Sequence, residues 1–354
     1  MTDLLAATAE LVDVASESWS EGPLVDRIST QLEAPGHLEV TRIGDNVVAR
    51  TALGRERRLI LAGHSDTVPA NGNGTARLAG DTLWGVGSAD MKGGLAVMLE
   101  SARTHRDPAV DMTYVFYARE EVAAEHNGLA EVARERPDLL VGDLALLGEP
   151  TDGALEAGCQ GSIRLRVTLV GARAHVARAW MGRNAIHRIG ALLVAVDAAE
   201  ARRPLIDGCR FHEALQVVGV SGGVSGNVVP DRVEVTLAHR FAPDRTAGEA
   251  EARLRDLLTP FLEEGDRVEV TDVSPAAPPA LDQPLLKAIV ARHQLEVRAK
   301  LGWTDVARFA ELGVPAANFG PGDPTLAHAA DERVTRDSIE RCWAVVDDLV
   351  TTGL

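Results

Sequence analysis

The sequence has no apolar run approaching the roughly 20 residues needed to cross a bilayer, which argues against a membrane-spanning protein. The first 18 residues, MTDLLAATAELVDVASES, lack the basic start of a secretory signal and predict an amphipathic helix. Cysteine is scarce, because Cys159, Cys209 and Cys342 are the whole set, scattered and without metal-ligand spacing. This usage is typical of a reducing compartment, so we expect a cytoplasmic protein whose thiols are unpaired.

Positive charge is also in short supply. The chain has 36 Lys and Arg residues against 52 Asp and Glu residues, a net charge of −16. A nucleic-acid partner requires a basic patch, so this balance argues against one. Solubility alone would explain the excess acid, but part of it could be gathered in one place to hold cations.

The length and composition suit a globular protein of two domains. The chain has 354 residues, 45% hydrophobic and 25% charged, and a domain usually contains roughly 100–200 residues. In the first part, helices are expected near 3–16, near 22–33, from Met91 and near 127–135, and short apolar runs occupy 46–51, 58–63, 112–118 and 143–150. Short strands that alternate with helices predict an α/β domain with a mostly parallel sheet.

The middle of the chain has a different pattern. GSIRLRVTLVG (161–171) alternates apolar and polar residues with a period of two, as in a half-exposed antiparallel strand. It is followed by a helix (182–203), two strands (215–223 and 231–241), a second helix (246–265) and a last strand (266–273). This β-α-β-β-α-β order predicts an α+β domain of the ferredoxin-like kind.

The last part returns to α/β character after the Pro/Ala-rich stretch 274–284, which is typical of a linker. A helix near 282–294, a strand at 314–319 and a closing helix from 335 are expected. We therefore predict a discontinuous first domain, 1–158 plus 276–354, interrupted by an inserted domain, 159–275.

Acidic residues and histidines follow the ends of the predicted strands. In chain order they are His64 and Asp66, Glu120 and Glu121, Glu149, and His328. Because ligand sites in open α/β sheets lie beyond the carboxyl ends of the strands, we expect these side chains to meet at one rim. Bound divalent cations would relieve the repulsion among so many acids. Histidines combined with carboxylates suit Zn²⁺, Co²⁺ or Mn²⁺ rather than a cysteine-type structural zinc.

Each of these features also has an ordinary structural explanation. The His64-x-Asp66 pair could be a loop histidine with a hydrogen bond, and Glu120 with Glu121 could be a solvated turn. Asp90 could be the N-cap of the helix that opens at Met91. Their succession after consecutive strands favours a shared site.

Five motifs resemble the M20 family of metallopeptidases and deacylases. They are GHSDTVP (63–69), WGVGSADMKGG (84–94), AREE (118–121), LGEPT (147–151) and AH (327–328). Their order, their spacing and the inserted domain extend the resemblance over nearly the whole chain. Within the family, GWTDVARF (302–309) and NFGPGDPTLAH (318–328) resemble the desuccinylases of succinyl-diaminopimelate, particularly the actinobacterial form.

The resemblance implies a site with two divalent metal ions per subunit, most readily Zn²⁺, with Co²⁺ or Mn²⁺ as alternatives. Asp90 would bridge the two ions. His64 and Glu149 would complete one metal site, and Glu121 and His328 would complete the other.

The resemblance also implies catalytic roles. Glu120 would be the general base that accepts a proton from water and returns it to the leaving amine. Asp66 would orient the imidazole of His64 and raise its basicity. Adjacent side chains on an extended backbone point in opposite directions, so Glu120 and Glu121 should have different roles.

The inserted domain resembles the dimerisation domain of the family. His175, in GARAHVARAWMGRNAI (171–186), would reach the active site of the partner subunit and stabilise an oxyanion there. Substrate contacts are implied for Asn227, Arg240, Thr304, Gly320 and Gly322. Arg240 suits a carboxylate, although Asn227 could be a turn residue and Arg240 a surface residue. Relatives from other bacteria have an Arg where this chain has Cys159 and Gln160, which leaves open what replaces it.

The predicted activity is hydrolysis of an N-succinyl amide, which releases succinate and LL-2,6-diaminopimelate, by a homodimer. A first alternative keeps the chemistry and changes the substrate, as in an acetylornithine deacetylase, an aminoacylase or a dipeptidase. A second alternative is a metal-binding module without catalysis. The presence of Glu120 beside an intact ligand set argues against the second alternative.

Overall fold

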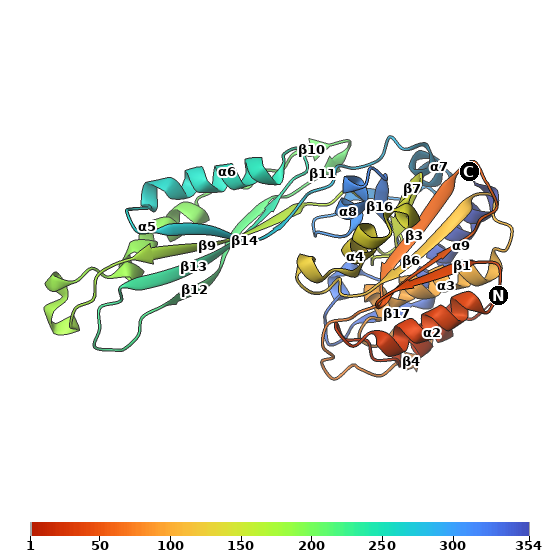
Figure 1. Ribbon diagram of the computed structural model, residues 1–354, viewed down its shortest axis with the longest axis horizontal. Coiled ribbons are helices and arrows are strands. Elements are labelled where there is room, and N and C mark those ends of the chain that lie inside the picture. Colours follow the sequence, from red (N-terminus) through yellow and green to blue (C-terminus); the bar gives the residue numbers. More distant parts are fainter. Residues whose placement is uncertain (1, 354) are drawn as a thin grey trace. The chain divides into compact units, whose positions relative to one another are not determined.

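The computed structural model describes residues 2–353, which divide into two compact units (Figure 1). The first unit comprises Met1–Gly158, Pro279–Ala299 and Asp305–Leu354, and the second comprises Cys159–Pro278 and Lys300–Thr304. The second unit therefore ends three residues later than the expected 275, and it also takes in the segment Lys300–Thr304. No helix within residues 2–353 is both long and apolar enough to span a bilayer.

The first unit is built around a mixed sheet in the order β1-β2-β6-β3-β7-β16-β8-β15. The strands are β1 (Glu39–Ile43), β2 (Asn46–Arg50), β3 (Arg58–His64), β6 (Asp111–Tyr117), β7 (Leu144–Leu147), β8 (Leu155–Ala157), β15 (Val297–Ala299) and β16 (Ala316–Asn318). The pairs β6–β3, β3–β7, β7–β16 and β8–β15 are parallel, and the pairs β1–β2, β2–β6 and β16–β8 are antiparallel. The predicted fold class, α/β with a mostly parallel sheet, is confirmed.

Helices cover both faces of this sheet. They are α1 (Leu4–Val12), α2 (Gly22–Glu33), α3 (Gly93–Thr104), α4 (Gly128–Glu135), α7 (Pro284–His293), α8 (Val306–Glu311) and α9 (Arg336–Thr352). Alternate strand residues such as Leu59, Leu61 and Tyr114 share one core with α1, α3 and α9. The residues between them, such as Ile60 and Val115, are also fully buried. Burial on both faces explains why the central strands read as continuous apolar runs.

The helix expected from Met91 begins at Gly93 instead. Residues Ser88–Lys92 form a separate turn, in which Asp90 has φ −116° and ψ 92°. Asp90 is therefore not the N-cap of α3, because the cap position is taken by Lys92, and the carboxylate of Asp90 is available for another role.

A close approach between two glycines sets the position of α3 against the end of β7. A Cβ atom on Gly94 would lie 2.2 Å from the carbonyl oxygen of Gly148. Only glycine fits this contact, which brings the start of α3 beside the residue that precedes Glu149.

A small second sheet, in the order β17-β5-β4, ties the C-terminal part of the first unit to the segment before α3. Its strands are β4 (Arg77–Ala79), β5 (Thr82–Trp84) and β17 (Arg333–Thr335). Arg333 pairs with Trp84 and Thr335 pairs with Thr82. The strand that follows His328 is therefore hydrogen-bonded to the strand that precedes Asp90.

The second unit has an antiparallel sheet in the order β12-β13-β9-β14, with α5 and α6 packed on one face (Figure 1). Its elements are β9 (Gly161–Val170), α5 (Ala185–Asp197), β10 (Leu205–Ile206), β11 (Cys209–Arg210), β12 (Ala214–Gly222), β13 (Arg232–Phe241), α6 (Ala247–Leu258) and β14 (Arg267–Ser274). The main elements follow the order β-α-β-β-α-β, with the small hairpin β10–β11 between α5 and β12.

Alternation along β9 explains the core of the second unit. Leu165 and Val167 are fully buried and pack with Leu192 of α5 and Leu254 of α6. Burying one leucine side chain stabilises a fold by about 1.5–3 kcal/mol. The helix expected over 182–203 ends at Asp197, because the rest of that stretch has no large apolar side chain to bury.

Candidate metal centre and active site

Three parallel strands of the first unit end at a common edge. His64 is the last residue of β3 and is paired with Tyr117, the last residue of β6. Ala62 of β3 is paired with Leu147, the last residue of β7. Residues that follow these strands therefore emerge at one rim of the sheet, as expected for a site in an α/β fold.

The rim brings four predicted ligands into a chain of short contacts. Asp90 Oδ1 lies 3.1 Å from Nε2 of His64, and Asp90 Oδ2 lies 3.6 Å from Nε2 of His328. His328 Nε2 lies 2.8 Å from Glu121 Oε1. Donor atoms of His64, Asp90 and Glu121 all lie within 4.8 Å of one another. Asp90 thus offers one oxygen to each histidine, which is the arrangement that a bridging carboxylate requires.

The hydrogen bonding of His64 suits a metal ligand. Its Nδ1 lies 3.1 Å from the backbone carbonyl oxygen of Asp66, which can only accept, so Nδ1 carries the proton. The lone pair of Nε2 then faces Asp90. This tautomer is the one that a divalent ion beside Asp90 would need.

Glu149 is the remaining predicted ligand. It lies two residues after β7 and is 5% exposed. Because Leu147 pairs with Ala62 of β3, Glu149 follows β7 at the same edge as His64, and its charge raises the pKa of both His64 and Glu120. The donor set, two imidazoles and several carboxylates, fits two ions of the Zn²⁺ type.

The carboxylate of Asp66 holds the loop that carries the two glutamates. Its Oδ1 accepts a hydrogen bond from the Glu120 amide (2.9 Å), and its Oδ2 accepts from the Glu121 amide (3.1 Å) and from Ser18 Oγ (2.7 Å). Its contact to His64 Nδ1 is longer, at 3.5 Å. Asp66 therefore contacts the metal rim mainly through backbone amides, which the sequence did not suggest.

The electrostatics of the rim reflect its excess of acids. Burial alone would lower the pKa of His64, but Asp66 and Asp90 outweigh it and raise the pKa well above its usual value. The hydrogen bond to Glu121 raises the pKa of His328 to about 9. Burial also raises the pKa of Glu120. The raised pKa values of both histidines indicate a site that favours positive charge.

Residues outside the predicted set also reach this region. Ser18 donates to Asp66, and Glu332 accepts from the amides of Ala89 and Asp90. Ser18 and Glu332 both lie in loops, and the sequence has many other polar residues in loops. Only their tertiary hydrogen bonds distinguish them, so no sequence signal identifies them.

The predicted glycines, Gly320 and Gly322, are buried in the loop before His328. The Gly320 amide donates to Thr151 Oγ1 (3.1 Å), and the Thr151 hydroxyl donates to the Gly320 carbonyl (3.0 Å). The Gly322 amide donates to Ser338 Oγ (3.0 Å). Gly322 has φ +90°, and a Cβ atom there would lie 2.8 Å from that of Ala89. These contacts give both glycines a packing role, while their substrate contacts stay a prediction.

The second unit brings His175 and Asn227 together. The amide of Val176 donates to the carbonyl of Asn227 (3.1 Å), and His175 forms a bridge with Val228. His175 Nδ1 accepts from the Ala177 amide (3.1 Å), so this hydrogen bond does not occupy Nε2.

Arg240 lies at the other end of the same sheet, and the carbonyl of Thr304 accepts from Cys159 Sγ (3.7 Å), two residues before β9. Arg240 pairs with Ser162 near the start of β9, whereas His175 follows Val170 at its end. Ser162 and Val170 are eight residues apart, a distance of about 27 Å along an antiparallel strand. The structure therefore does not bring Arg240 and His175 of one chain into a single small site.

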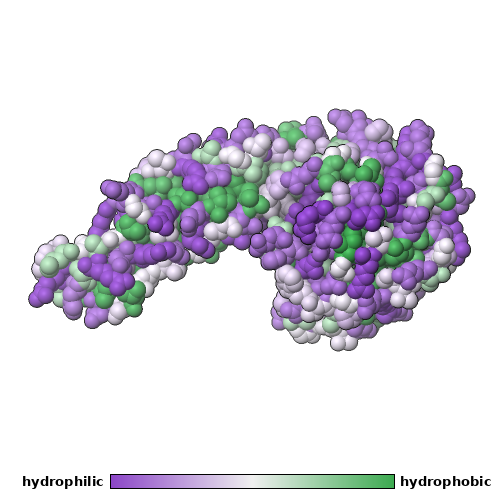
Figure 2. All heavy atoms as spheres, viewed as in Figure 1, coloured by the Kyte–Doolittle hydropathy of each residue, from purple (hydrophilic) through white to green (hydrophobic). Residues whose placement is uncertain are grey.

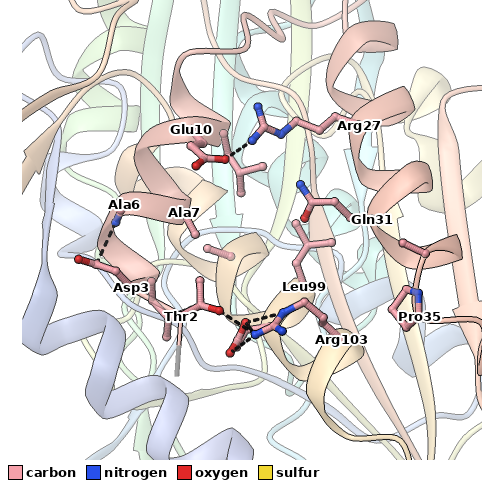
Figure 3. A pocket seen from close by; sticks show the side chains of 15 residues that line it. Thr2, Asp3, Ala6, Ala7, Glu10, Arg27, Gln31, Pro35, Leu99 and Arg103 are labelled. Atoms are coloured by element: carbon pink, nitrogen blue, oxygen red, sulfur yellow. Dashed lines mark hydrogen bonds and ion pairs between the residues drawn. The ribbon is translucent and has the colours of Figure 1, made fainter.

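A separate cavity of about 400 Å³ lies between α1, α2 and α3 (Figure 3). Arg103 in it donates to Thr2 Oγ1 (2.7 Å) and to Glu100, and Arg27 pairs with Glu10. Among the described residues, none of the predicted ligands lines this cavity. Its charges are satisfied internally, so it is not the candidate active site.

Comparison with known proteins agrees with this geometry. A Mycobacterium tuberculosis protein provisionally named succinyl-diaminopimelate desuccinylase is 48% identical over 333 residues, covering 94% of this chain and 93% of its own. The succinyl-diaminopimelate desuccinylase of Corynebacterium glutamicum is 41% identical over 351 residues, covering 97% and 95%. The crystal structure of a tripeptidase from Staphylococcus aureus has a similar fold, with a TM-score of 0.80 at 20% identity over 98% of this chain and 96% of that one.

The model of the peptidase family M20/M25/M40 matches residues 60–352. This range contains every predicted metal ligand, and the predicted family is confirmed. The chain belongs to the peptidase family M20/M25/M40.

Proposed function

We propose that this chain is a two-metal amide hydrolase that cleaves N-succinyl-LL-2,6-diaminopimelate to succinate and LL-2,6-diaminopimelate. The observation that carries the proposal is the meeting of His64, Asp90 and Glu121, from three separate segments, with donor atoms within 4.8 Å of one another. With Glu149 and His328 they would hold two divalent ions, Zn²⁺ first, with Co²⁺ or Mn²⁺ as alternatives.

The chemistry divides between bound metal and protein. Bound divalent ions would lower the pKa of a water molecule and polarise the amide carbonyl. Glu120 would accept a proton from the water as its oxygen attacks the carbonyl carbon, and deliver it to the nitrogen as the C–N bond breaks. Asp66 holds the amides of both Glu120 and Glu121. The contact of Glu121 with His328 supports a ligand role for Glu121, and we assign the proton transfer to Glu120.

The substrate follows from the relatives. The Corynebacterium glutamicum and Mycobacterium tuberculosis proteins, at 41% and 48% identity over nearly the whole chain, both carry a name for the succinyl-diaminopimelate reaction. We propose the same substrate here, in a cytoplasmic enzyme of lysine and diaminopimelate synthesis. Arg240 would bind one of the substrate carboxylates, with Asn227 and Thr304 as further contacts.

We further propose a homodimer formed by the second unit. Exposed apolar side chains are frequent on this unit (Figure 2), and they include Val176, Trp180, Met181, Val194 and Val218. Its strand β12 lies at an edge of the sheet, and exposed edge strands favour pairing with another chain. Within one unit, Arg240 and His175 lie at opposite ends of β9, whose residues Ser162 and Val170 are about 27 Å apart, and this supports a role for His175 in the site of the partner subunit.

A substrate comparison tests the proposed reaction. The purified protein reconstituted with Zn²⁺ is assayed with succinyl-diaminopimelate and with acetylornithine, an N-acetyl amino acid and a dipeptide. We expect turnover of the succinyl compound with kcat/KM at least 100-fold above the others. A preference for the acetyl compound would move the chain to another substrate of the same family.

Two further assays test the roles of the residues. Glu120→Gln should lose nearly all turnover while both metal ions stay bound, and unchanged turnover would make Glu120 structural. Mixed dimers of Glu120→Gln and His175→Ala chains should regain activity at one of their two sites. No recovery in heterodimers shown to form would mean that each subunit works alone.

A further inference from the structure

Glu332 is a buried carboxylate that the proposed mechanism does not use. It is 1% exposed and lies four residues after His328. Its Oε1 accepts hydrogen bonds from the backbone amides of Ala89 (3.0 Å) and Asp90 (3.1 Å). The second of these amides belongs to the residue that would bridge the two metal ions.

The backbone around Glu332 is fixed on both sides. Its amide donates to the Ala329 carbonyl (3.1 Å), and its carbonyl accepts from the Gly85 amide (3.1 Å). The next residue begins β17, which pairs with β5 just before the turn that carries Asp90. Glu332 thus has little freedom to move relative to the two amides that it holds.

A buried cation lies close to this carboxylate. Lys92 is also 1% exposed, and its Nζ donates to the Val14 carbonyl (2.9 Å). Burial lowers the pKa of Lys92 to about 8, while the charge of Glu332 acts in the opposite direction. Burial raises the pKa of Glu332 to about 7, although its hydrogen bonds to backbone amides, including those of Asp90 and Ala89, act in the opposite direction.

We propose that Glu332 is a positioning residue of the metal centre: by holding the amides of Ala89 and Asp90, it sets the bridging carboxylate of Asp90 between His64 and His328. The turn over Ser88–Lys92 is not a regular helix, so helical hydrogen bonds do not fix Asp90. The side chain of Glu332 supplies that constraint from the segment that also carries His328. It couples the position of the bridging ligand to the position of a second ligand.

The inference rests on the proposed two-metal function, and it makes a prediction about geometry rather than charge. In Glu332→Gln the side-chain amide oxygen can still accept from both backbone amides. In Glu332→Asp the charge stays, but the shorter side chain cannot reach both of them. If the hydrogen bonds to the two amides matter, the metal affinity of Glu332→Gln should resemble that of the wild type, and that of Glu332→Asp should resemble that of Glu332→Ala. If the negative charge of Glu332 matters instead, Glu332→Asp should keep the metal affinity and Glu332→Gln should lose it.

The experiment measures metal binding to metal-free protein by calorimetric titration with Zn²⁺. We expect Glu332→Ala and Glu332→Asp to bind at least one ion 10–100-fold more weakly than the wild type, the range for residues that orient metal ligands. Glu332→Gln should stay within about threefold. Wild-type affinity in Glu332→Ala, or a weaker Gln than Asp variant, would overturn the inference.

A matched control separates positioning from general loss of stability. Glu213 is a buried glutamate of the second unit that also accepts from a backbone amide, that of Ala242 (3.1 Å). Glu213→Ala should lower the melting temperature and leave both metal affinities within twofold of the wild type. An equal loss of metal affinity in this control would overturn the assignment to Glu332.

Hydrogen exchange distinguishes this inference from the proposed function. In metal-free protein, Glu332→Ala should speed exchange of the amides of Ala89 and Asp90, while Glu332→Gln should not. Unchanged exchange would overturn the inference even if the wild type binds two ions. A wild type that binds fewer than two ions would instead overturn the proposed function, whatever the exchange result.

Discussion

Replacing Asp66 with asparagine tests how the loop of Glu120 and Glu121 is held. The two carboxylate oxygens accept from the two backbone amides, one each, and Ser18 donates to one of them. Asparagine has one acceptor oxygen, and its NH₂ group can only donate. In either orientation of Asp66→Asn, one glutamate amide therefore faces a donor instead of an acceptor.

The magnitude follows from this lost acceptor. A buried amide without a partner costs about 1–3 kcal/mol. We expect Asp66→Asn to lower the free energy of unfolding of metal-free protein by that amount. Because Glu121 is a proposed ligand in the disturbed loop, we also expect at least one metal ion to bind 10–100-fold more weakly.

The assay uses urea denaturation of metal-free protein and competition with a chromophoric chelator for Zn²⁺. Ser18→Ala is the matched control, because it removes one donor and leaves both amides on the carboxylate. It should change metal affinity less than threefold. Asp66→Asn that unfolds at the wild-type urea concentration and binds Zn²⁺ within twofold of the wild type would refute the reasoning.

Three further predictions concern pH, packing and metal. Burial raises the pKa of Asp266, but hydrogen bonds from Arg188 and two backbone amides outweigh it and hold the pKa below its usual value. The stabilisation from ionised Asp266 is therefore present above about pH 4 and is lost as the pH falls through the folded pKa. The difference in unfolding free energy between wild type and Arg188→Met should narrow on acid titration, and a constant difference would contradict the pairing. Gly94→Ala should destabilise the protein by about 1–3 kcal/mol, because its Cβ would lie 2.2 Å from the Gly148 carbonyl oxygen. In contrast, Gly190→Ala, with nothing within 4 Å in α5, should stabilise it by about 0.5–1 kcal/mol; equal melting temperatures for the two variants would speak against this account. Thorough chelation should abolish amide hydrolysis, and Zn²⁺ or Co²⁺ should restore it; full turnover by metal-free protein would rule out a metal-dependent reaction.

Much of the fold could be predicted from local patterns. The apolar runs that became β3, β6 and β7 are buried on both faces, and continuous hydrophobicity reports this directly. The period of two along β9 likewise reports a sheet with one covered face. In contrast, strands of three residues such as β8 and β15 were not predicted, because they are too short to carry a period.

Part of the site could also be predicted in this way. Acids and histidines directly after buried strands indicate a common rim, since the ends of parallel strands share one edge. His64 and the Glu120–Glu121 pair reach the rim for this reason. The alternative explanation of Asp90 as a helix cap was wrong, because α3 begins at Gly93 and Asp90 lies in a turn whose backbone conformation no local pattern predicts.

What the sequence by itself determined is therefore the order of the main elements and the family, together with a proposal for the residues that carry the chemistry. Only the tertiary structure decided which groups hold them: Asp66 on the amides of Glu120 and Glu121, and Glu332 on the amides of Ala89 and Asp90. The physical reason is that a side chain bonded to a distant backbone amide leaves no periodicity in the sequence. Every residue has such an amide except proline, so the partner cannot be identified until the chain is folded.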